Sequence, residues 1–248
     1  MPATFRHLDD MQQACSQCSL ARLCLPCGLG ADDVARLEKL VDVGRKFARN
    51  VPLFTQGDRL TAIYVVGSGA LKTSTMSADG LEQITGFHYP GDLLGLDGVA
   101  AMEHRCSATA LEDSAVCRIP FERLDALLDD LPSLRRRLMR LMSQALSEDD
   151  QLLLTLGRKN SEGRIASLLV SLASRREMRG MSLSPVHLSM KRTDLANYLG
   201  MRIETVSRVL RRLQESGIIC VHRSLVDILD FDALQTWSSC GAWVGDRE

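Results

Sequence analysis

The sequence predicts an α+β protein in three parts: an N-terminal β-roll, a long helix, and a C-terminal winged helix-turn-helix. Short β-branched runs separated by glycine occupy residues 41–121, and a segment free of glycine and proline follows at 133–156. A pattern of helix, tight turn, helix and hairpin then begins near residue 161. We expect domain divisions at residues 1–30, 31–130, 131–158 and 159–248, the first being a cysteine-bearing loop.

The composition excludes several broad classes of protein. The chain has 248 residues, of which 45% are hydrophobic and 25% charged, and no apolar run reaches membrane-spanning length. It begins without a basic-then-apolar leader, so we expect a cytoplasmic protein without membrane contact. Five histidines, and no catalytic-triad, metal-hydrolase or phosphate-loop pattern, argue against an enzyme.

The β-roll is predicted from four strand-like runs joined by turns. The runs are Ile63–Val66, Leu71–Thr75, Gln83–His88 and Ala115–Ile119. The turns between them contain Gly67-Ser68-Gly69, Ala78-Asp79-Gly80 and Pro90-Gly91-Asp92. Because short turns of this kind join antiparallel neighbours, the runs indicate an antiparallel barrel or roll.

The long helix carries two apolar stripes. The first is expected to pack on the β-domain of the same chain and consists of Leu134, Leu138, Leu141, Ala145 and Leu152. The second has heptad-like spacing, is expected to meet a partner chain, and consists of Met139, Met142, Leu146, Leu153 and Leu156. Asp149 lies in the gap of this second stripe. The alternative is a helix that is simply buried within one domain.

The C-terminal third is basic although the whole chain is nearly neutral. Thirteen Lys or Arg and five Asp or Glu lie between Arg158 and Arg223, whereas the net charge of the chain is -1. Such an asymmetry is typical of a module that binds a polyanion. Within this region two short helices around Gly200 are predicted to pack through Leu195, Ala196, Leu199, Ile203 and Val206.

The second of these helices, predicted at 203–215, has the chemistry of a DNA-reading helix. Glu204, Ser207 and Arg208 share one face, and Arg208 can bond guanine while Glu204 accepts from a base amine. A further set is expected to grip phosphates and set the register, namely Arg192, Thr193, Thr205, Arg211 and Arg212. An ordinary charged helix with a Glu204–Arg208 pair is the alternative.

The stretch from Gly200 to Arg208 resembles the signature of the CRP/FNR superfamily of bacterial transcription regulators, Gly-x3-Glu-Thr-Val-Ser-Arg. The resemblance covers nearly the whole chain. It implies a cyclic-nucleotide-binding-like β-roll, a dimerisation helix, and a homodimer on palindromic double-stranded DNA with TTGAT-type half-sites. The turn Ala78-Asp79-Gly80 resembles a surface that contacts RNA polymerase in this family, as an activator would.

A cluster of cysteines near the start of the chain indicates a metal site. Cys15, Cys18 and Cys24 lie on one short loop, and a fourth sulfur from a distant part of the fold would complete a four-thiolate site. The arrangement resembles the FNR branch (fumarate and nitrate reduction regulators). That resemblance implies a [4Fe-4S] cluster held by Cys15, Cys18, Cys24 and Cys117 under anaerobic conditions, and hence an oxygen sensor.

Other readings of the cysteines stay open at this point. Cys27 with the three loop cysteines could form a structural zinc site. Alternatively, a regulator of the same fold could respond to a cyclic nucleotide, haem or nitric oxide, with structural cysteines. Cyclic-nucleotide binders of the family carry Gly-Glu-Leu and Arg-Ser-Ala, where this chain has Gly95-Leu96-Asp97 and Cys106-Ser107-Ala108, so both charged residues are missing at those positions, although Arg105 lies beside the second. His88 and His104 are expected to be ordinary polar residues rather than haem ligands, and Cys106, Cys220 and Cys240 packing residues.

The expected mechanism joins the metal site to dimerisation. Metal ligation couples to local folding, and Cys117 precedes the long helix by about a dozen residues. In a parallel dimer Asp149 faces its symmetry mate, and like charges about 4 Å apart repel by roughly 4 kcal/mol at an effective dielectric near 20. We therefore expect the cluster-free protein to be monomeric and the cluster-bearing protein to dimerise.

Overall fold

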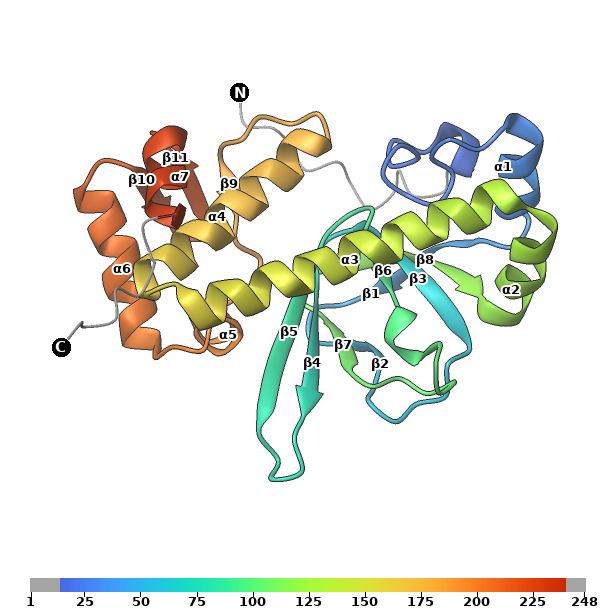
Figure 1. The fold of residues 1–248 in the computed structure, drawn as a ribbon, viewed down its shortest axis with the longest axis horizontal. Helices are drawn as coiled ribbons and strands as arrows, with labels where there is room; N and C mark the ends of the chain where they lie inside the picture. The colour runs from blue at the N-terminus through green and yellow to red at the C-terminus, as the bar shows by residue number, and fades with distance from the viewer. Residues whose placement is uncertain (1–13, 240–248) are drawn as a thin grey trace. The chain divides into compact units, whose positions relative to one another are not determined.

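Two four-stranded antiparallel sheets form a β-roll in the first half of the chain (Figure 1); the structure is a computed structural model that describes residues 14–239. The sheet orders are β1-β8-β3-β6 and β2-β7-β4-β5. The strands are β1 (Asp42–Phe47), β2 (Pro52–Phe54), β3 (Ala62–Ser68), β4 (Leu71–Met76), β5 (Glu82–His88), β6 (Leu93–Leu94), β7 (Ser107–Ala110) and β8 (Ser114–Pro120).

The four strands expected from the sequence are confirmed as β3, β4, β5 and β8, each slightly longer than predicted. Sequence patterns missed β1, β2, β6 and β7. Two of these have only two or three residues, and β1 has an irregular register between Asp42 and Arg45, so none offers a sustained alternation of apolar residues.

Strand β3 lies between two hydrophobic cores. Ala62, Tyr64 and Val66 point to the interior of the roll, where they pack with Phe54. Ile63 and Val65 point to the other face of the sheet and join a second core. Successive strand residues face opposite sides, so this apolar run serves both cores at once. The second core is where residues from the N-terminal segment and the helices meet the sheet.

Helices cover this outer face of the first sheet. They are α1 (Ala31–Glu38), α2 (Phe121–Asp130) and α3 (Pro132–Arg158), of which α1 and α2 were not predicted. Arg36 of α1 pairs with Asp130 at 2.5 Å, and the Ser133 hydroxyl donates to Asp33 at 2.8 Å. Leu37, Leu124 and Leu134 are fully buried in the core beneath. These contacts hold the start of α3 against the β-roll.

The second half of the chain forms the winged helix-turn-helix. It consists of α4 (Ser161–Met178), β9 (Val186–His187), α5 (Arg192–Tyr198), α6 (Ile203–Glu215), β10 (Ile219–His222), β11 (Leu225–Ile228) and α7 (Phe231–Ser239). The predicted bounds of α6 are confirmed, α4 begins at the expected residue 161, and β9 adds a third strand to the predicted hairpin. Gly200 has φ +60 at the turn between α5 and α6, a conformation that favours glycine.

The chain divides into two compact units, residues 1–144 and 145–248, and the division falls inside α3. The predicted long helix therefore exists, and it ends at Arg158, two residues beyond Leu156. Residues 1–13 and 240–248 of the predicted first and last domains, with Cys240, lie outside the described residues.

Candidate functional site

The N-terminal segment is a chain of tight turns that presents three cysteines. Cys15 lies in a short 3-10 helix, η2 (Cys15–Gln17), and the Cys18 N–H donates to the Cys15 carbonyl. The Cys24 N–H donates to the Leu20 carbonyl at 3.0 Å. Leu25 follows with no exposed surface, and so anchors the segment in the core beside α3. Backbone bonds and the buried Leu25 thus contribute to holding these turns.

Cys117 faces this segment because of strand register. It pairs with Val65 across β8 and β3, and its neighbour at i+2, Ile119, pairs with Ile63. All four residues therefore lie on the outer face of the first sheet, whereas Val116 points into the roll.

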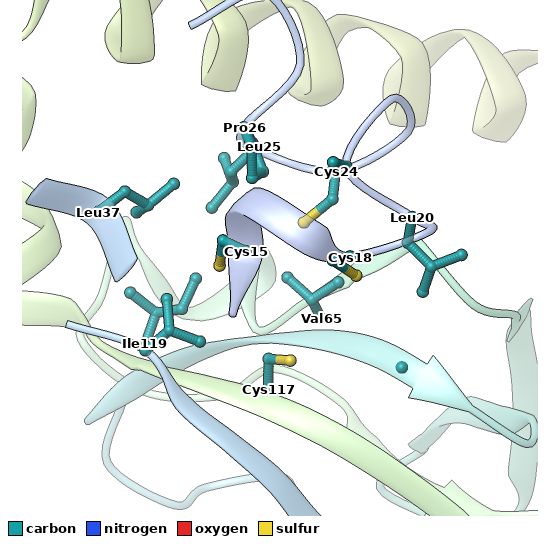
Figure 2. Close-up of a pocket in the computed structure, with 13 residues that line it drawn as sticks. Cys15, Cys18, Leu20, Cys24, Leu25, Pro26, Leu37, Val65, Cys117 and Ile119 are labelled. Atoms are coloured by element: carbon teal, nitrogen blue, oxygen red, sulfur yellow. The ribbon is translucent and has the colours of Figure 1, made fainter. Parts of the chain in front are cut away.

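The four predicted ligands line one cavity. Cys15, Cys18 and Cys24 approach it from the N-terminal segment and Cys117 from β8 (Figure 2). The rest of the lining is almost entirely apolar and includes Leu20, Leu25, Leu37, Val65 and Ile119. Cys27 does not line this cavity. The fold thus brings together the cysteine set that includes Cys117, and not the one that includes Cys27.

Burial and neighbouring cysteines make the thiols of Cys15, Cys24 and Cys117 hard to ionise. Burial, then the charges of Cys117, Glu38 and Cys18, raise the pKa of Cys15 to about 11. Burial raises the pKa of Cys24 to about 12, with further contributions from Cys117, Cys15 and Cys18. The pKa of Cys117 is raised for the same reasons, burial first and Cys18 second. Thiolates of Cys15, Cys24 and Cys117 are therefore disfavoured unless a positive group lies beside them.

Within residues 14–239, no three Cys, His, Asp or Glu side chains are arranged to hold a single metal ion. A tetrahedral zinc ion with Zn–S bonds of about 2.3 Å needs its sulfurs close together. A four-iron cluster takes one cysteine per iron, so its four sulfurs surround a larger group.

Asp97 is the centre of a hydrogen-bond network inside the β-roll. The Asp97 carboxylate accepts from the backbone N–H groups of Arg105 and Cys106 at 2.8 and 3.2 Å, and from the Cys106 thiol. Its other oxygen lies 3.4 Å from Nδ1 of His104, a buried ring that stacks on Phe54. His104 is thus the ordinary polar residue that the sequence predicted, and Cys106 also bonds rather than only packs.

The two stripes predicted on α3 differ in how far their side chains are exposed. Leu134 is fully buried, and Leu138 and Leu141 pack against the second core, as predicted. Met139, Leu146 and Leu153 are 64%, 66% and 67% exposed, and Met142 is 38% exposed. Ala145 is exposed, contrary to prediction, so the packing stripe is shorter than its sequence suggests. A helix buried all round is thereby excluded.

Asp149 lies on the exposed side of α3 among acidic neighbours. Burial, and then Asp150, raise the pKa of Asp149. Glu148 is engaged differently, because Arg175 of α4 donates to its carboxylate. Of the acidic residues in this stretch, Asp149 is the one that the heptad spacing places in the stripe.

The helix-turn-helix exposes the residues predicted to read DNA. Glu204, Ser207 and Arg208 are all exposed on α6, whereas Val206, Val209 and Leu210 on its other face are buried. Leu195, Ala196 and Leu199 are buried as predicted; Ile203, however, is 38% exposed, because it opens the first turn of α6. Of the other predicted residues, Thr193 is exposed and Arg192 and Thr205 are half-buried.

Arg211 and Arg212 differ in their surroundings although both are exposed. Arg211 pairs with Glu215, one turn further along its own helix, at 3.7 Å. Arg212 donates to Glu162 of α4 and lies 5.8 Å from the ring of Trp237 in α7. In the wing, Cys220 Sγ lies 3.2 Å from Nε2 of His222, so Cys220 is not a simple packing residue.

Comparison with known proteins identifies the family. A Crp-like helix-turn-helix domain model matches residues 163–237, and a cyclic nucleotide-binding domain model matches residues 44–130. The "Transcriptional activator protein Anr" of Pseudomonas protegens is 48% identical over 219 residues, which cover 88% of this chain and 90% of that protein. This chain belongs to the FNR-type branch of the CRP/FNR family of transcription regulators.

Other members of the CRP/FNR family extend the comparison. The "Fumarate and nitrate reduction regulatory protein" of Salmonella typhi is 40% identical over 220 residues, covering 89% of this chain and 88% of that protein. Among solved structures, FixK2 from Bradyrhizobium japonicum has a TM-score of 0.73 and 26% identity, over 80% of this chain and 98% of that one. The relatives thus cover both the β-roll and the helix-turn-helix of this FNR-type chain. In residues 14–239 of this chain, no helix has the length and apolar character to span a membrane.

Proposed function

We propose that this protein is an oxygen-responsive transcription activator, which binds a [4Fe-4S] cluster under anaerobic conditions, dimerises, and recognises TTGAT-type palindromic DNA. One observation carries the proposal. Cysteines from two distant parts of the chain, Cys15, Cys18 and Cys24 on one side and Cys117 on the other, line a single apolar cavity. Membership of this family of DNA-binding transcription regulators indicates that the site controls transcription.

The donor set fits the proposed group. Four thiols are the usual ligands of a four-iron cluster, and the apolar lining formed by Leu25, Val65 and Ile119 shields them from water. Because the pKa values of Cys15 and Cys24 are raised, thiolate formation there depends on a bound positive group. When bound, the cluster supplies an oxygen-labile link between the N-terminal segment and β8.

Dimerisation is assigned to the exposed stripe of α3. Met139, Met142, Leu146 and Leu153 would meet the same residues of a second chain, while the two Asp149 carboxylates oppose the contact. Their repulsion keeps the cluster-free chains apart, and the link between Cys117 and the N-terminal segment shifts the balance toward the dimer. The two α6 helices then read successive major grooves about 34 Å apart.

The remaining contacts belong to DNA and to RNA polymerase. Arg208 is proposed to bond guanine, Glu204 to accept a hydrogen bond from a base amine, and Ser207 to bond either kind of base group. Each good base contact contributes about 1–3 kcal/mol of discrimination. Arg192, Thr193, Thr205, Arg211 and Arg212 are proposed phosphate contacts. The turn Ala78-Asp79-Gly80 between β4 and β5 is proposed to meet RNA polymerase, in the cytoplasm.

A serine scan tests the cluster. We expect anaerobically purified protein to contain about four iron and four acid-labile sulfide atoms per chain. Serine at Cys15, Cys18, Cys24 or Cys117 should remove them, whereas Cys27→Ser, the matched control on the same segment, should retain them. An indispensable Cys27 with a dispensable Cys117 would refute the ligand set, and colourless, iron-free wild-type protein would refute the sensor.

A gel shift tests the function as a whole. Protein prepared under nitrogen should bind a TTGAT palindrome, and exposure of the same sample to air should release the DNA as iron is lost. Binding that survives air unchanged would leave a DNA-binding regulator without an oxygen sensor. In that case a small-ligand regulator of the same fold becomes the better hypothesis.

A further inference from the structure

One arginine of α3 is bonded directly to the cysteine segment. Nε of Arg137 donates to the Cys24 carbonyl at 3.1 Å, and its Nη2 donates to the Leu23 carbonyl at 2.6 Å. The two groups are more than a hundred residues apart in sequence. A guanidinium that bonds two successive carbonyls constrains both the position and the direction of that peptide, because its donors lie in one plane.

The rest of the contact between α3 and the segment surrounds this arginine. Leu134 and Leu141, at i−3 and i+4 from Arg137, belong to the same core as Leu25 and Cys24. Helical spacing therefore gives α3 one face for the cysteine segment and another for the exposed Met139–Leu153 stripe. A displacement of the cysteine segment would therefore act on α3 through the contacts of this face.

Arg137 differs from the other arginines in this part of α3. It is half-buried, whereas Arg135, Arg136 and Arg140 are exposed. The bonded carbonyls include that of Cys24, whose side chain lines the four-cysteine cavity. Arg137 is thus the polar connection between a cavity cysteine and the helix that carries the dimerisation stripe.

We propose that Arg137 is a positioning residue that couples the cysteine segment to α3, so that the state of the four-cysteine site sets the position of the dimerisation stripe. The coupling rests on the proposed function, because it assigns α3 to dimerisation and the cavity to the cluster. Arg137 acts through the backbone carbonyls of Leu23 and Cys24. Arg137 fixes the backbone of Cys24 against α3, so that ordering of the cysteine segment also changes the position of the helix.

The first arm of the test uses full-length, cluster-free protein. Alkylation of each cysteine by iodoacetamide is followed by peptide mass spectrometry, with Cys106 as the internal reference because it packs in the other core. Arg137→Gln should label Cys24 about tenfold faster than wild type, since a hydrogen bond to a charged group is lost. Arg136→Gln, an exposed arginine one residue away, should label as wild type. Arg137→Lys should label at an intermediate rate, because it keeps a cation and a donor.

The second arm uses protein loaded under nitrogen. At four iron per chain, judged by iron analysis and the visible absorption band, Arg137→Gln should dimerise about tenfold more weakly than wild type in sedimentation. Arg137→Lys should restore part of this loss. Unchanged Cys24 labelling, or unchanged dimerisation of the loaded Arg137→Gln protein, would overturn the proposal. If wild-type protein takes up no iron, the proposed function fails and the coupling with it; faster labelling of Arg137→Gln would still show that Arg137 holds the segment.

Discussion

Burial, and then mutual proximity, control the cavity cysteines at the scale of single residues. Burial is the leading cause that raises the pKa of Cys15 to about 11 and that of Cys24 to about 12. At neutral pH the thiols are therefore protonated unless a positive group replaces the protons. In the proposed function the cluster supplies that positive group.

The raised pKa values predict alkaline destabilisation of the cluster-free protein. A thiol whose pKa is higher in the folded state stabilises the fold below its unfolded pKa of 9.0, and this stability is lost as pH rises toward about 11 for Cys15 and about 12 for Cys24. Urea unfolding of anaerobic, cluster-free protein should show the loss. The Cys15→Ala, Cys24→Ala double variant should lose less stability over that pH range, and an equal loss in both proteins would contradict the assignment.

The two neighbouring arginines of α6 are predicted to behave differently toward DNA. Arg211 can turn toward phosphates, so Arg211→Gln should reduce the slope of log affinity against log salt by about 1 for each of its phosphate contacts. Arg212 is held by Glu162 and Trp237, so Arg212→Gln should mainly lower the stability of the C-terminal unit. Binding titrations across salt concentrations, with thermal unfolding of the same proteins, distinguish the two. Equal salt slopes for both variants would refute the distinction.

At the scale of elements, α3 is a helix with two different tasks. Its buried face begins at Leu134 and holds the N-terminal segment, while Met139, Leu146 and Leu153 leave much apolar surface exposed. Burying one such side chain is worth about 1.5–3 kcal/mol, so a partner helix that covers the stripe gains considerable free energy. In the proposed mechanism the charge of Asp149 within the stripe opposes this gain and makes it depend on the cluster.

Removing the Asp149 charge should therefore release dimerisation from the cluster. Asp149→Ala protein is expected to dimerise and bind DNA in air, as measured by sedimentation and gel shift. Because the pKa of Asp149 is raised, lowering the pH toward it should also promote association of the wild-type, cluster-free chain. Asp150→Ala is the matched comparison and should have the smaller effect, since Asp150 lies beside the stripe. An Asp149→Ala protein that stays monomeric in air would remove Asp149 from the mechanism.

At the scale of the whole molecule, one helix belongs to both units. The division between residues 144 and 145 falls within α3, so the β-roll and the winged helix-turn-helix share a continuous backbone. In the second unit, Arg164 of α4 donates to the Leu156 carbonyl in α3 at 2.7 Å. It also donates to the carbonyl of Leu199, next to Gly200 in the turn between α5 and α6, at 2.8 Å. Arg164 thus joins the end of α3 to the turn that precedes α6.

A symmetric dimer predicts a strict spacing of DNA half-sites. Two α6 helices about 34 Å apart require half-site centres about one helical turn apart, that is 10–10.5 bp. Inserting about half a turn between the half-sites should abolish high-affinity binding by anaerobic protein, because one recognition helix then faces the wrong side of the duplex. Gel shifts on matched palindromes measure this, and unaltered affinity would mean that each chain binds alone.

Prediction from the sequence succeeded where the pattern is local. The bounds of α6, Ile203–Glu215, match the expected 203–215, because its apolar positions recur with helical spacing after Gly200. It failed for β2 and β6, which are too short to carry a period, and for Ile203, whose place in the first helical turn leaves it 38% exposed. Ala145 was also misassigned, since spacing alone does not say where a packing face ends.

The sequence by itself determined the fold class, the family and the residues that α6 presents, since each depends on spacings within a few turns of chain. Only the tertiary structure decided that Cys117, and not Cys27, shares a cavity with Cys15, Cys18 and Cys24. That choice depends on the register of β8 against β3 and on how Leu25 anchors the N-terminal segment, which are contacts between residues far apart in the chain. The same holds for Arg137, whose carbonyl partners lie more than a hundred residues away.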